Sequence, residues 1–486
     1  MSTCNTLGLD VYIPSDDMPW NAIRVKHLYR RAGYGANFET IQNALSMTPS
    51  DLVDLLVDEA LLKTPLPDPG WGYWDQPTIL DYYGGNYIAE SRQYLEYAFF
   101  DSMRNDNLFG RMTMFWSNHF VTEENLLKDP PYLYQQFLMR QTHCVGNFKD
   151  FVRAVGTDPS MLFYLNGYQN TAGTPNENYA RELYELFTLG VDNGYTEDDI
   201  VETSRALTGY NTRTAVWGEV LFNANNTFDT TDKTIFGQTG NWGYDDVIDI
   251  LFEQKPTLIA NYICEKLYKY FVASEVNEDI VIELAQTFID NDFEIAPVLR
   301  QLFKSEHFFS DDAIGTLIKS PIDLIIQLQN ELNIYTESTD NTLNRRVSLI
   351  SYYLEMAVFD PPNVAGWPGD EFWLNSVTIP ERWLRIKHVL NIRKNEGLGI
   401  YAALAISMFD DVNEPADNVA RGIVDLFLTK DLYYENEYEE AIATFKDGVP
   451  STYFEDGTWD LTYFNLDTQV WNLLRYIQEL PEFQLK

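Results

Sequence analysis

Apolar side chains recur at helical spacing through most of the chain, and this repetition limits the fold more than any other feature. Leu52, Leu55 and Leu56 share one face of a segment that begins with Thr48 and Pro49. A capping residue followed by proline is typical of the start of a helix. The pattern therefore predicts a helix from about residue 49.

Similar spacing occurs over residues 255–272, 281–303 and 321–332. Thr378 and Glu381 have the spacing of a capping box and predict a helix that runs to about residue 394. No series of alternating strands is found, although short strands could form within 216–228. These patterns predict a mainly α fold with at most a few short strands.

Two long segments between these helices are rich in proline and aromatic residues, 65–86 and 360–377. Loops of this kind usually pack over the surface of a large domain, and less often line a binding cleft. We expect an N-terminal extension over 1–19, one large irregular helical domain over 20–395, and a C-terminal helical extension over 396–486 packed on it.

The chain is strongly acidic, with 73 Asp and Glu against 34 Lys and Arg and a formal net charge of −39. Such a charge repels phosphate backbones, so we expect no binding to nucleic acid. No apolar run reaches the roughly 18 residues that a membrane span needs. The first twenty residues lack the basic and apolar regions of a secretory signal, which favours a cytoplasmic protein, with export by another route left open.

Signatures of metal and cofactor sites are missing from the sequence. Its three cysteines and five histidines are scattered, with neither a CxxC nor an HExxH motif. No phosphate-binding GxxxxGK[ST] loop and no GxSxG nucleophile motif occur. Acidic runs at 290–292 and 409–414 lack the ligand spacing of an EF-hand. We therefore expect no metal and no evident cofactor.

The densest polar segment covers residues 176–190. On a helix, Glu177, Arg181 and Glu185 would follow one another at i, i+4 steps, with Asn176 and Glu182 close by. One interpretation is a solvated face held by ion pairs worth a few tenths of a kcal/mol each. The other is a charged row that looks into a cleft, where Glu177 or Glu182 could act as a base. The second interpretation requires these polar residues to be buried or to line a cleft.

Two further positions admit a structural and a functional interpretation. His119 lies among aromatic residues, so it is either a hydrogen-bonded core residue or a general acid or base held by Asn118. Asn363, Trp367 and Trp373 either pin a turn-rich loop or form a stacking platform for a sugar ring or another flat ligand.

Several of these segments resemble a large bacterial family known as DUF1800, a domain of unknown function, in the form found in Bacteroidetes. The matching pieces occur in order from about residue 20 to 395. They include 27–35 (HLYRRAGYG), 115–120 (FWSNHF), 175–183 (PNENYAREL), 188–190 (TLG), 195–197 (YTE), 205–209 (RALTG), 266–272 (KLYKYFV), 318–321 (IKSP), 361–368 (PPNVAGWP), 373–376 (WLNS) and Arg382.

What this resemblance implies is limited, because the family has no established reaction. Its members look mainly helical and many are secreted. Their genes often lie beside those of another uncharacterised family that resembles sulfatases and phosphatases, which hints at exported polymers or at sulfated or phosphorylated material. Members often carry His-Asp where Thr231 and Asp232 stand here, so a metal role for that histidine cannot be transferred.

Two classes of function remain open. In the first, an acid/base enzyme such as a hydrolase acts on a polyanionic or carbohydrate-like substrate. Its catalytic residues would be Glu177, Glu182 and His119. In the second, which the missing catalytic signatures favour, the chain is a non-catalytic binding or assembly factor for a protein partner or an anionic or carbohydrate ligand. The residues expected to contact a ligand are His27, Arg31, Asn176, Arg181, Asn363, Trp367 and Arg382.

Basic residues are scarce, yet they cluster in two similar segments, 24–31 and 382–394. One explanation is that each cluster neutralises nearby Asp and Glu. The alternative is that Arg31 and Arg382 approach each other and hold a carboxylate, sulfate or phosphate, for which guanidinium groups are suited.

Overall fold

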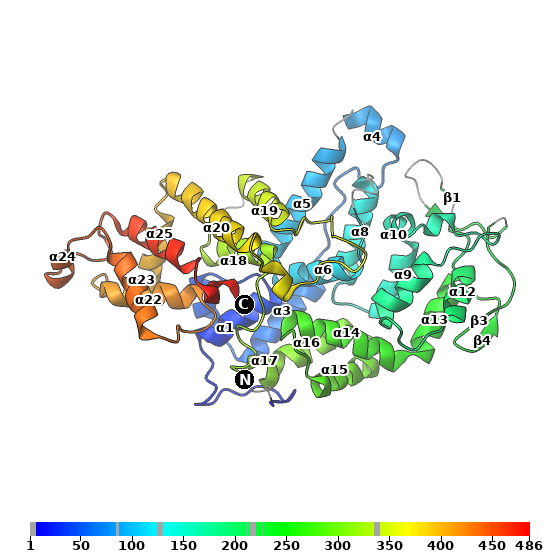
Figure 1. Ribbon diagram of the computed structural model, residues 1–486, viewed down its shortest axis with the longest axis horizontal. Coiled ribbons are helices and arrows are strands. Elements are labelled where there is room, and N and C mark those ends of the chain that lie inside the picture. Colours follow the sequence, from blue (N-terminus) through cyan, green and yellow to red (C-terminus); the bar gives the residue numbers. More distant parts are fainter. Residues whose placement is uncertain are drawn as a thin grey trace.

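A computed structural model describes residues 6–83, 87–123, 130–210, 212–213, 220–225, 227–334 and 341–486. The chain is mainly helical, as the apolar spacing predicts (Figure 1). Helices α9, α12 and α13 lie with the short strands at one end of an elongated molecule, and α22–α25 lie at the other. Helices α1, α3, α6 and α18 occupy the middle, and the C-terminal end of the chain returns to them.

The α-helices are distributed over the whole described chain. Their bounds are α1 (Ala22–Ala32), α2 (Phe38–Leu45), α3 (Pro49–Leu62), α4 (Gln76–Tyr83), α5 (Tyr87–Asn105), α6 (Asn107–His119), α8 (Pro130–His143), α9 (Phe148–Thr157), α10 (Pro159–Tyr164), α11 (Asn178–Glu182), α12 (Glu197–Ala206), α13 (Tyr244–Gln254), α14 (Pro256–Phe271), α15 (Glu278–Asp290), α16 (Ile295–Lys304), α17 (Glu306–Phe309), α18 (Pro321–Glu331), α19 (Asn341–Tyr353), α20 (Thr378–Asn395), α21 (Ile400–Met408), α22 (Ala416–Phe427), α23 (Glu435–Lys446), α24 (Ser451–Glu455) and α25 (Leu466–Ile477).

Other regular structure is short. A π-helical segment covers Leu183–Thr188, and 3₁₀ turns cover Gly167–Gln169, Asp370–Trp373 and Pro481–Gln484. Two antiparallel ladders pair β1 (Thr212–Arg213) with β2 (Val220–Leu221), and β3 (Lys233–Ile235) with β4 (Gln238–Gly240). Strand β2 falls in the region where the sequence allows short strands, and residues 216–219 and 226 of that region lie outside the described residues.

Capping side chains set several of the helix starts. Thr48 accepts a hydrogen bond from the backbone of Asp51 at the start of α3. Ser320 and Asp323 form a reciprocal capping box at the start of α18. The capping box predicted from Thr378 is wrong, because Thr378 is already helical and its hydroxyl donates to the carbonyl of Trp373 instead. Local spacing therefore predicted where α20 lies but not how it begins.

The helix predicted over 281–303 is two helices, α15 and α16, separated by a tight turn. Asp292 and Phe293 have φ angles of 51° and 63° in that turn, a conformation that ends a helix. The apolar spacing continues across the turn because both helices bury residues in the same core. A second correction concerns 65–86, which was expected to be a loop but holds α4.

The C-terminal helices pack on the beginning of the chain. The Lys26 side chain of α1 donates to the carbonyls of Asp425 and Leu428, and Arg30 donates to that of Phe427 at 3.1 Å. Residues 484–486 then run beside 317–319, where the backbone of Lys319 donates to the Gln484 carbonyl at 2.8 Å. These contacts bring residue 486 next to α6 and α18, in the centre of the molecule (Figure 1).

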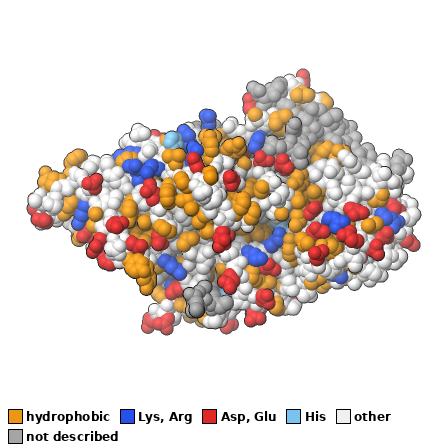
Figure 2. Space-filling model, in the orientation of Figure 1, with side chains coloured by type: hydrophobic (Ala, Val, Ile, Leu, Met, Phe, Trp, Pro, Cys, Tyr) orange, Lys and Arg blue, Asp and Glu red, His pale blue; other side chains and the backbone are white. Residues whose placement is uncertain are grey.

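Acidic side chains are spread across the face shown in Figure 2, with Lys and Arg between them. Among the described residues, no helix is both long and apolar enough to cross a membrane.

Candidate functional site

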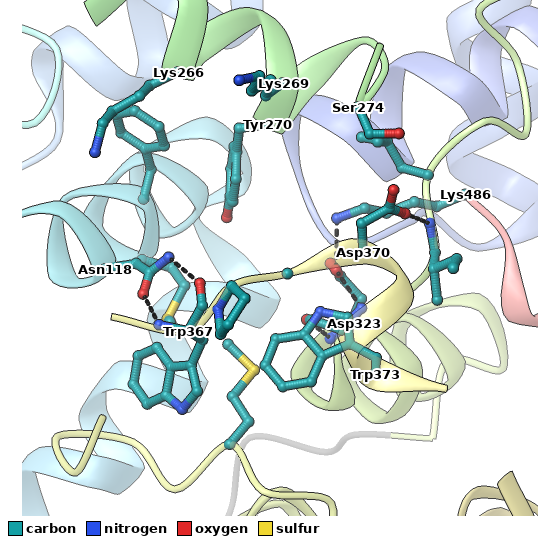
Figure 3. A pocket seen from close by; sticks show the side chains of 18 of the residues that line it. Asn118, Lys266, Lys269, Tyr270, Ser274, Asp323, Trp367, Asp370, Trp373 and Lys486 are labelled. Atoms are coloured by element: carbon teal, nitrogen blue, oxygen red, sulfur yellow. Dashed lines mark hydrogen bonds and ion pairs between the residues drawn. The ribbon is translucent and has the colours of Figure 1, made fainter. Parts of the chain in front are cut away.

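A cavity of about 370 Å³ opens between α6, α14, the start of α18 and the aromatic loop over 356–373. Figure 3 shows Lys266, Lys269 and Tyr270 on α14 at one side of it, and Trp367 and Trp373 of the loop at the other. Lys486 and Asp323 complete its inner wall. A cavity of this size accommodates a small organic molecule.

The inner wall is built on a buried ion-pair cluster. Arg111 of α6 reaches Asp323 of α18 at 2.6 Å, and Lys486 reaches the other carboxylate oxygen at 2.5 Å. Arg111 also lies 3.8 Å from the centre of the Tyr34 ring and donates to the Gly33 carbonyl. Burial alone would raise the pKa of Asp323, but the charges of Arg111 and Lys486 outweigh it and hold that pKa well below its usual range.

The opposite wall carries two lysines that differ in their surroundings. Lys269 pairs with Glu265 at 2.5 Å, and its side chain is 48% exposed. Lys266 lies deeper, with its ammonium 4.8 Å from the centre of the Tyr262 ring. Burial lowers the pKa of Lys266 to about 8, the charge of Glu265 opposes this shift, and the charge of Lys269 adds to it.

His119, at the end of α6, is a buried and neutral residue of the same cavity. Its Nε2 is 3.0 Å from the carbonyl oxygen of Phe187, which can only accept, so Nε2 carries the proton and Nδ1 is the acceptor. Nδ1 is buried and has no hydrogen-bond partner. Burial, followed by the charge of Lys266, holds the pKa of His119 well below its usual value.

The aromatic loop is fixed to α6 by one side chain. The Asn118 amide donates to the Trp367 carbonyl at 3.1 Å and accepts from the Trp367 backbone at 2.7 Å (Figure 3). The approach is so close that a Cβ on Gly366 would lie 2.2 Å from the Asn118 side-chain oxygen. Asn363 is exposed and shapes the same loop, since its side chain accepts from the backbone of Ala365.

The polar segment over 176–190 lies at the surface instead of lining this cavity. Arg181 binds Glu197 at 2.8 Å and reaches Glu177 and Glu185 at 3.3 Å each. The side chains of Arg181 and Glu177 are 33% and 43% exposed. The Asn176 side chain accepts from the backbone of Asn178. The expectation that this row is buried or cleft-lining is therefore not met.

The second half of this segment, over residues 183–190, contacts a residue of the cavity wall. After α11 the chain continues as a π-helix and ends at Gly190, whose φ of +98° is the left-handed conformation expected there. Glu182 is half-buried, and burial raises its pKa. The π-helix supplies the Phe187 carbonyl that fixes the His119 ring. The segment thus supports the wall from behind through its backbone.

Three further predicted residues are buried in the same part of the molecule without lining the cavity. His27 bonds the Phe308 carbonyl at 3.0 Å. Arg31 donates to the Ala313 carbonyl and Thr316, and Arg382 donates to Gln484 and to the Lys319 carbonyl. Guanidinium nitrogens of both arginines, and the Lys319 ammonium, are buried and find no hydrogen-bond partner in the part of the chain that the structure describes.

Of the ten predicted site residues, His119 and Trp367 line the cavity. Sequence reasoning did not select Arg111, Lys266, Asp323 or Lys486. Arg111 did carry a usable signal, because it is a lone charge in the apolar run LFGRMTMFW. Asp323 was not selected because its position three residues after Ser320 is that of a helix-capping residue, which explains a carboxylate there without a further role. Among the described residues, no group of three or more His, Cys, Asp and Glu side chains is arranged to hold a metal ion.

Comparison with known proteins identifies the family alone. No curated protein and no solved structure matches the chain. The family described as "Protein of unknown function (DUF1800)" matches residues 27–485, and so includes the cavity lining apart from Lys486 and both sides of the boundary suggested at residue 395. The chain therefore belongs to the DUF1800 family.

Proposed function

We propose that this protein binds a small organic anion in the cavity between α6, α14 and the Trp367 loop. The observation that carries the proposal is a local reversal of charge. Acidic residues outnumber basic ones about two to one in the whole chain, whereas cations predominate in the cavity wall. The Arg, Lys, Asp and Glu side chains that line the cavity are Arg111, Lys266, Lys269 and Lys486 against Asp323 and Asp370.

Buried charges near the cavity add to this excess. Asp323 is shared by Arg111 and Lys486, and its own charge balances only one of them. Its field also reaches the buried Arg31 and Arg382. Uncompensated buried cations are costly, and an anion nearby would lower that cost. Arg31 and Arg382 would therefore act on the ligand through the electrostatic potential rather than by direct contact.

The other walls favour a ligand with an apolar or flat part. Phe115, Tyr270, Trp367 and Trp373 line the cavity around the cations. Aromatic faces stack on sugar rings and other flat groups, and they exclude water from charged contacts. Carboxylated or phosphorylated small molecules and acidic sugars combine both properties.

An acid/base enzyme is the second candidate, and one observation favours it. His119 is neutral, and its Nδ1 lone pair has no partner within the cavity wall. This nitrogen can accept a proton from a bound molecule once a rotation of the ring opens it to the cavity, because it is buried in the structure. Glu177 lies on the surface network of Arg181, so His119 replaces it as the expected base.

A thermal-shift and calorimetric screen tests the proposed binding. Sulfate, phosphate and glucuronate are compared at constant ionic strength, using the wild type and Lys266→Met. We expect stabilisation of the wild type and at least about ten-fold weaker binding by the variant, because a charged contact contributes roughly 1.5–3 kcal/mol. Lys149→Met is the matched control, since Lys149 pairs with Asp249 elsewhere. Equal responses of all three proteins would refute the proposal.

A further inference from the structure

Lys266 differs from the other basic residues of the cavity wall in having no anionic partner. Arg111 and Lys486 share Asp323, and Lys269 binds Glu265. Within the described part of the chain, Lys266 makes neither an ion pair nor a hydrogen bond, and its recorded contact is the face of the Tyr262 ring. The Tyr262 ring and the charge of Glu265 stabilise this ammonium, but they offset only part of the cost of its burial.

The surroundings of Lys266 favour a free amine. The Lys269 charge lies one helical turn away, and the adjacent wall is aromatic. Burial and the Lys269 charge disfavour the protonated form, the Glu265 charge and the face of the Tyr262 ring favour it, and the balance lowers the pKa to about 8. A desolvated lysine beside a second cation is a recognised arrangement for an amine nucleophile.

A proton acceptor is present in the same cavity. Lys266 and His119 both line this cavity. The Nδ1 of His119 is the acceptor nitrogen and has no hydrogen-bond partner among the described residues, but it is buried, so the ring must rotate before Nδ1 can take a proton from a bound molecule. The cavity thus combines an amine, a neutral base and further cations that can hold an anionic group.

We infer that Lys266 is a nucleophile that forms an imine with a carbonyl compound bearing a carboxylate or a similar anionic group. The inference rests on the proposed anion binding and names its substrate class, the oxo acids. The Nζ lone pair attacks the carbonyl carbon, and His119 accepts the proton that the nitrogen loses. The carbonyl oxygen takes up this proton from His119 and then the second proton that the nitrogen gives up, and it leaves as water as the C=N bond forms. The sum is amine plus carbonyl giving imine plus water, without an oxidant or reductant.

Reductive trapping of the whole protein tests this step. Glyoxylate and cyanoborohydride are added at pH 7, so that an imine is reduced to carboxymethyl-lysine, and peptide mass spectrometry measures the rate at each lysine. An amine with a pKa of about 8 is roughly one-tenth unprotonated at pH 7, against less than about one in a thousand for an ordinary lysine. Because lower basicity also reduces nucleophilicity, we expect a net preference of about ten-fold for Lys266 over Lys269 and Lys255.

Two controls distinguish the nucleophilic role of Lys266 from the proposed binding of anions in the cavity. Propanal in place of glyoxylate should reduce the preference, because it lacks the anionic group. Lys266→Arg keeps the positive charge without a nucleophilic amine, so it should retain stabilisation by anions and lose selective trapping. If the wild type binds anions but Lys266 is trapped no faster than Lys269, the nucleophile is wrong and the binding proposal stands. If anions do not bind either, both are wrong.

Discussion

The surface network around Arg181 and the buried cluster around Asp323 contain the same kinds of side chain but differ in what surrounds them. Arg181 is half-exposed and has three carboxylates within reach on its own and the next helix. Asp323 is buried and receives cations from α6 and from residue 486. The first set has three carboxylates around one cation, but solvent reaches it and screens the excess, whereas the second leaves positive charge buried. The comparison teaches that a buried residual charge is a better reason to propose a site than a dense row of charges at the surface.

The largest expected effect is at the buried cluster. Asp323→Asn leaves Arg111 and Lys486 buried without a counter-charge, so we expect a loss of about 3–5 kcal/mol in the free energy of unfolding. Urea denaturation followed by circular dichroism measures it. Asp245→Asn, which removes an exposed partner of Arg153, is the control and should cost less than about 1 kcal/mol. Similar losses for the two variants would show that the cluster is not buried as described.

A smaller effect is expected where the aromatic loop meets α6. Gly366→Ala places a Cβ against Asn118, whereas Gly369→Ala has nothing within 4 Å of the added atom. The two glycines have nearly equal φ angles, 81° and 82°, so an Ala side chain meets an unfavourable φ at either position. We expect Gly366→Ala to cost about 1–3 kcal/mol more than Gly369→Ala and to weaken anion binding. Equal stability of the two variants would contradict the Asn118 contact.

The pH dependence of stability tests the state of His119. Its pKa is lower in the folded protein than the unfolded value of about 6.5, so the unfolded chain binds more protons between these values. Stability is therefore lost as pH falls below about 6.5, by up to about 1.4 kcal/mol per pH unit from this residue. His119→Gln should show a shallower loss between pH 6.5 and 5 in urea titrations. Parallel curves for the variant and the wild type would mean that His119 titrates normally.

The smallest effect is expected at the surface network. Arg181→Ala should cost less than about 1 kcal/mol, because its partners are solvated and screened by salt. The difference from the wild type should shrink further in 1 M NaCl, where the screening length is about 3 Å. Anion binding by the cavity should be unchanged. A large loss of anion binding in this variant would show that the polar segment over 176–190 takes part in the binding site after all.

Much of the fold could be predicted because apolar spacing and caps are local properties. The start of α3 followed from Thr48 and Pro49, and the mainly helical class followed from the repetition itself. The break between α15 and α16 could not be found in the same way, since it depends on two residues in left-handed conformations rather than on a change of spacing.

The candidate site was predictable only in part for a similar reason. His119 and Trp367 stand in segments of unusual composition, and both line the cavity. Glu265 and Lys269 have the i, i+4 spacing of a helical ion pair, so the local pattern indicates that Glu265 pairs with Lys269 and leaves its neighbour Lys266 without a partner on the same helix. Whether another part of the chain then supplies a partner for Lys266 is decided by tertiary packing, which spacing along one helix does not show.

Residue 486 completes the cavity wall although it is far in sequence from the other wall residues. This separation determines when the cavity can form during folding. Asp323 and its partner Lys486 are separated by 163 positions, and Arg30 and Phe427 by 397. Contacts between such distant positions form late, because the loop that joins them must first be closed. The helices can therefore assemble before the cavity exists, and the time to acquire ligand binding should lag behind the time to acquire secondary structure.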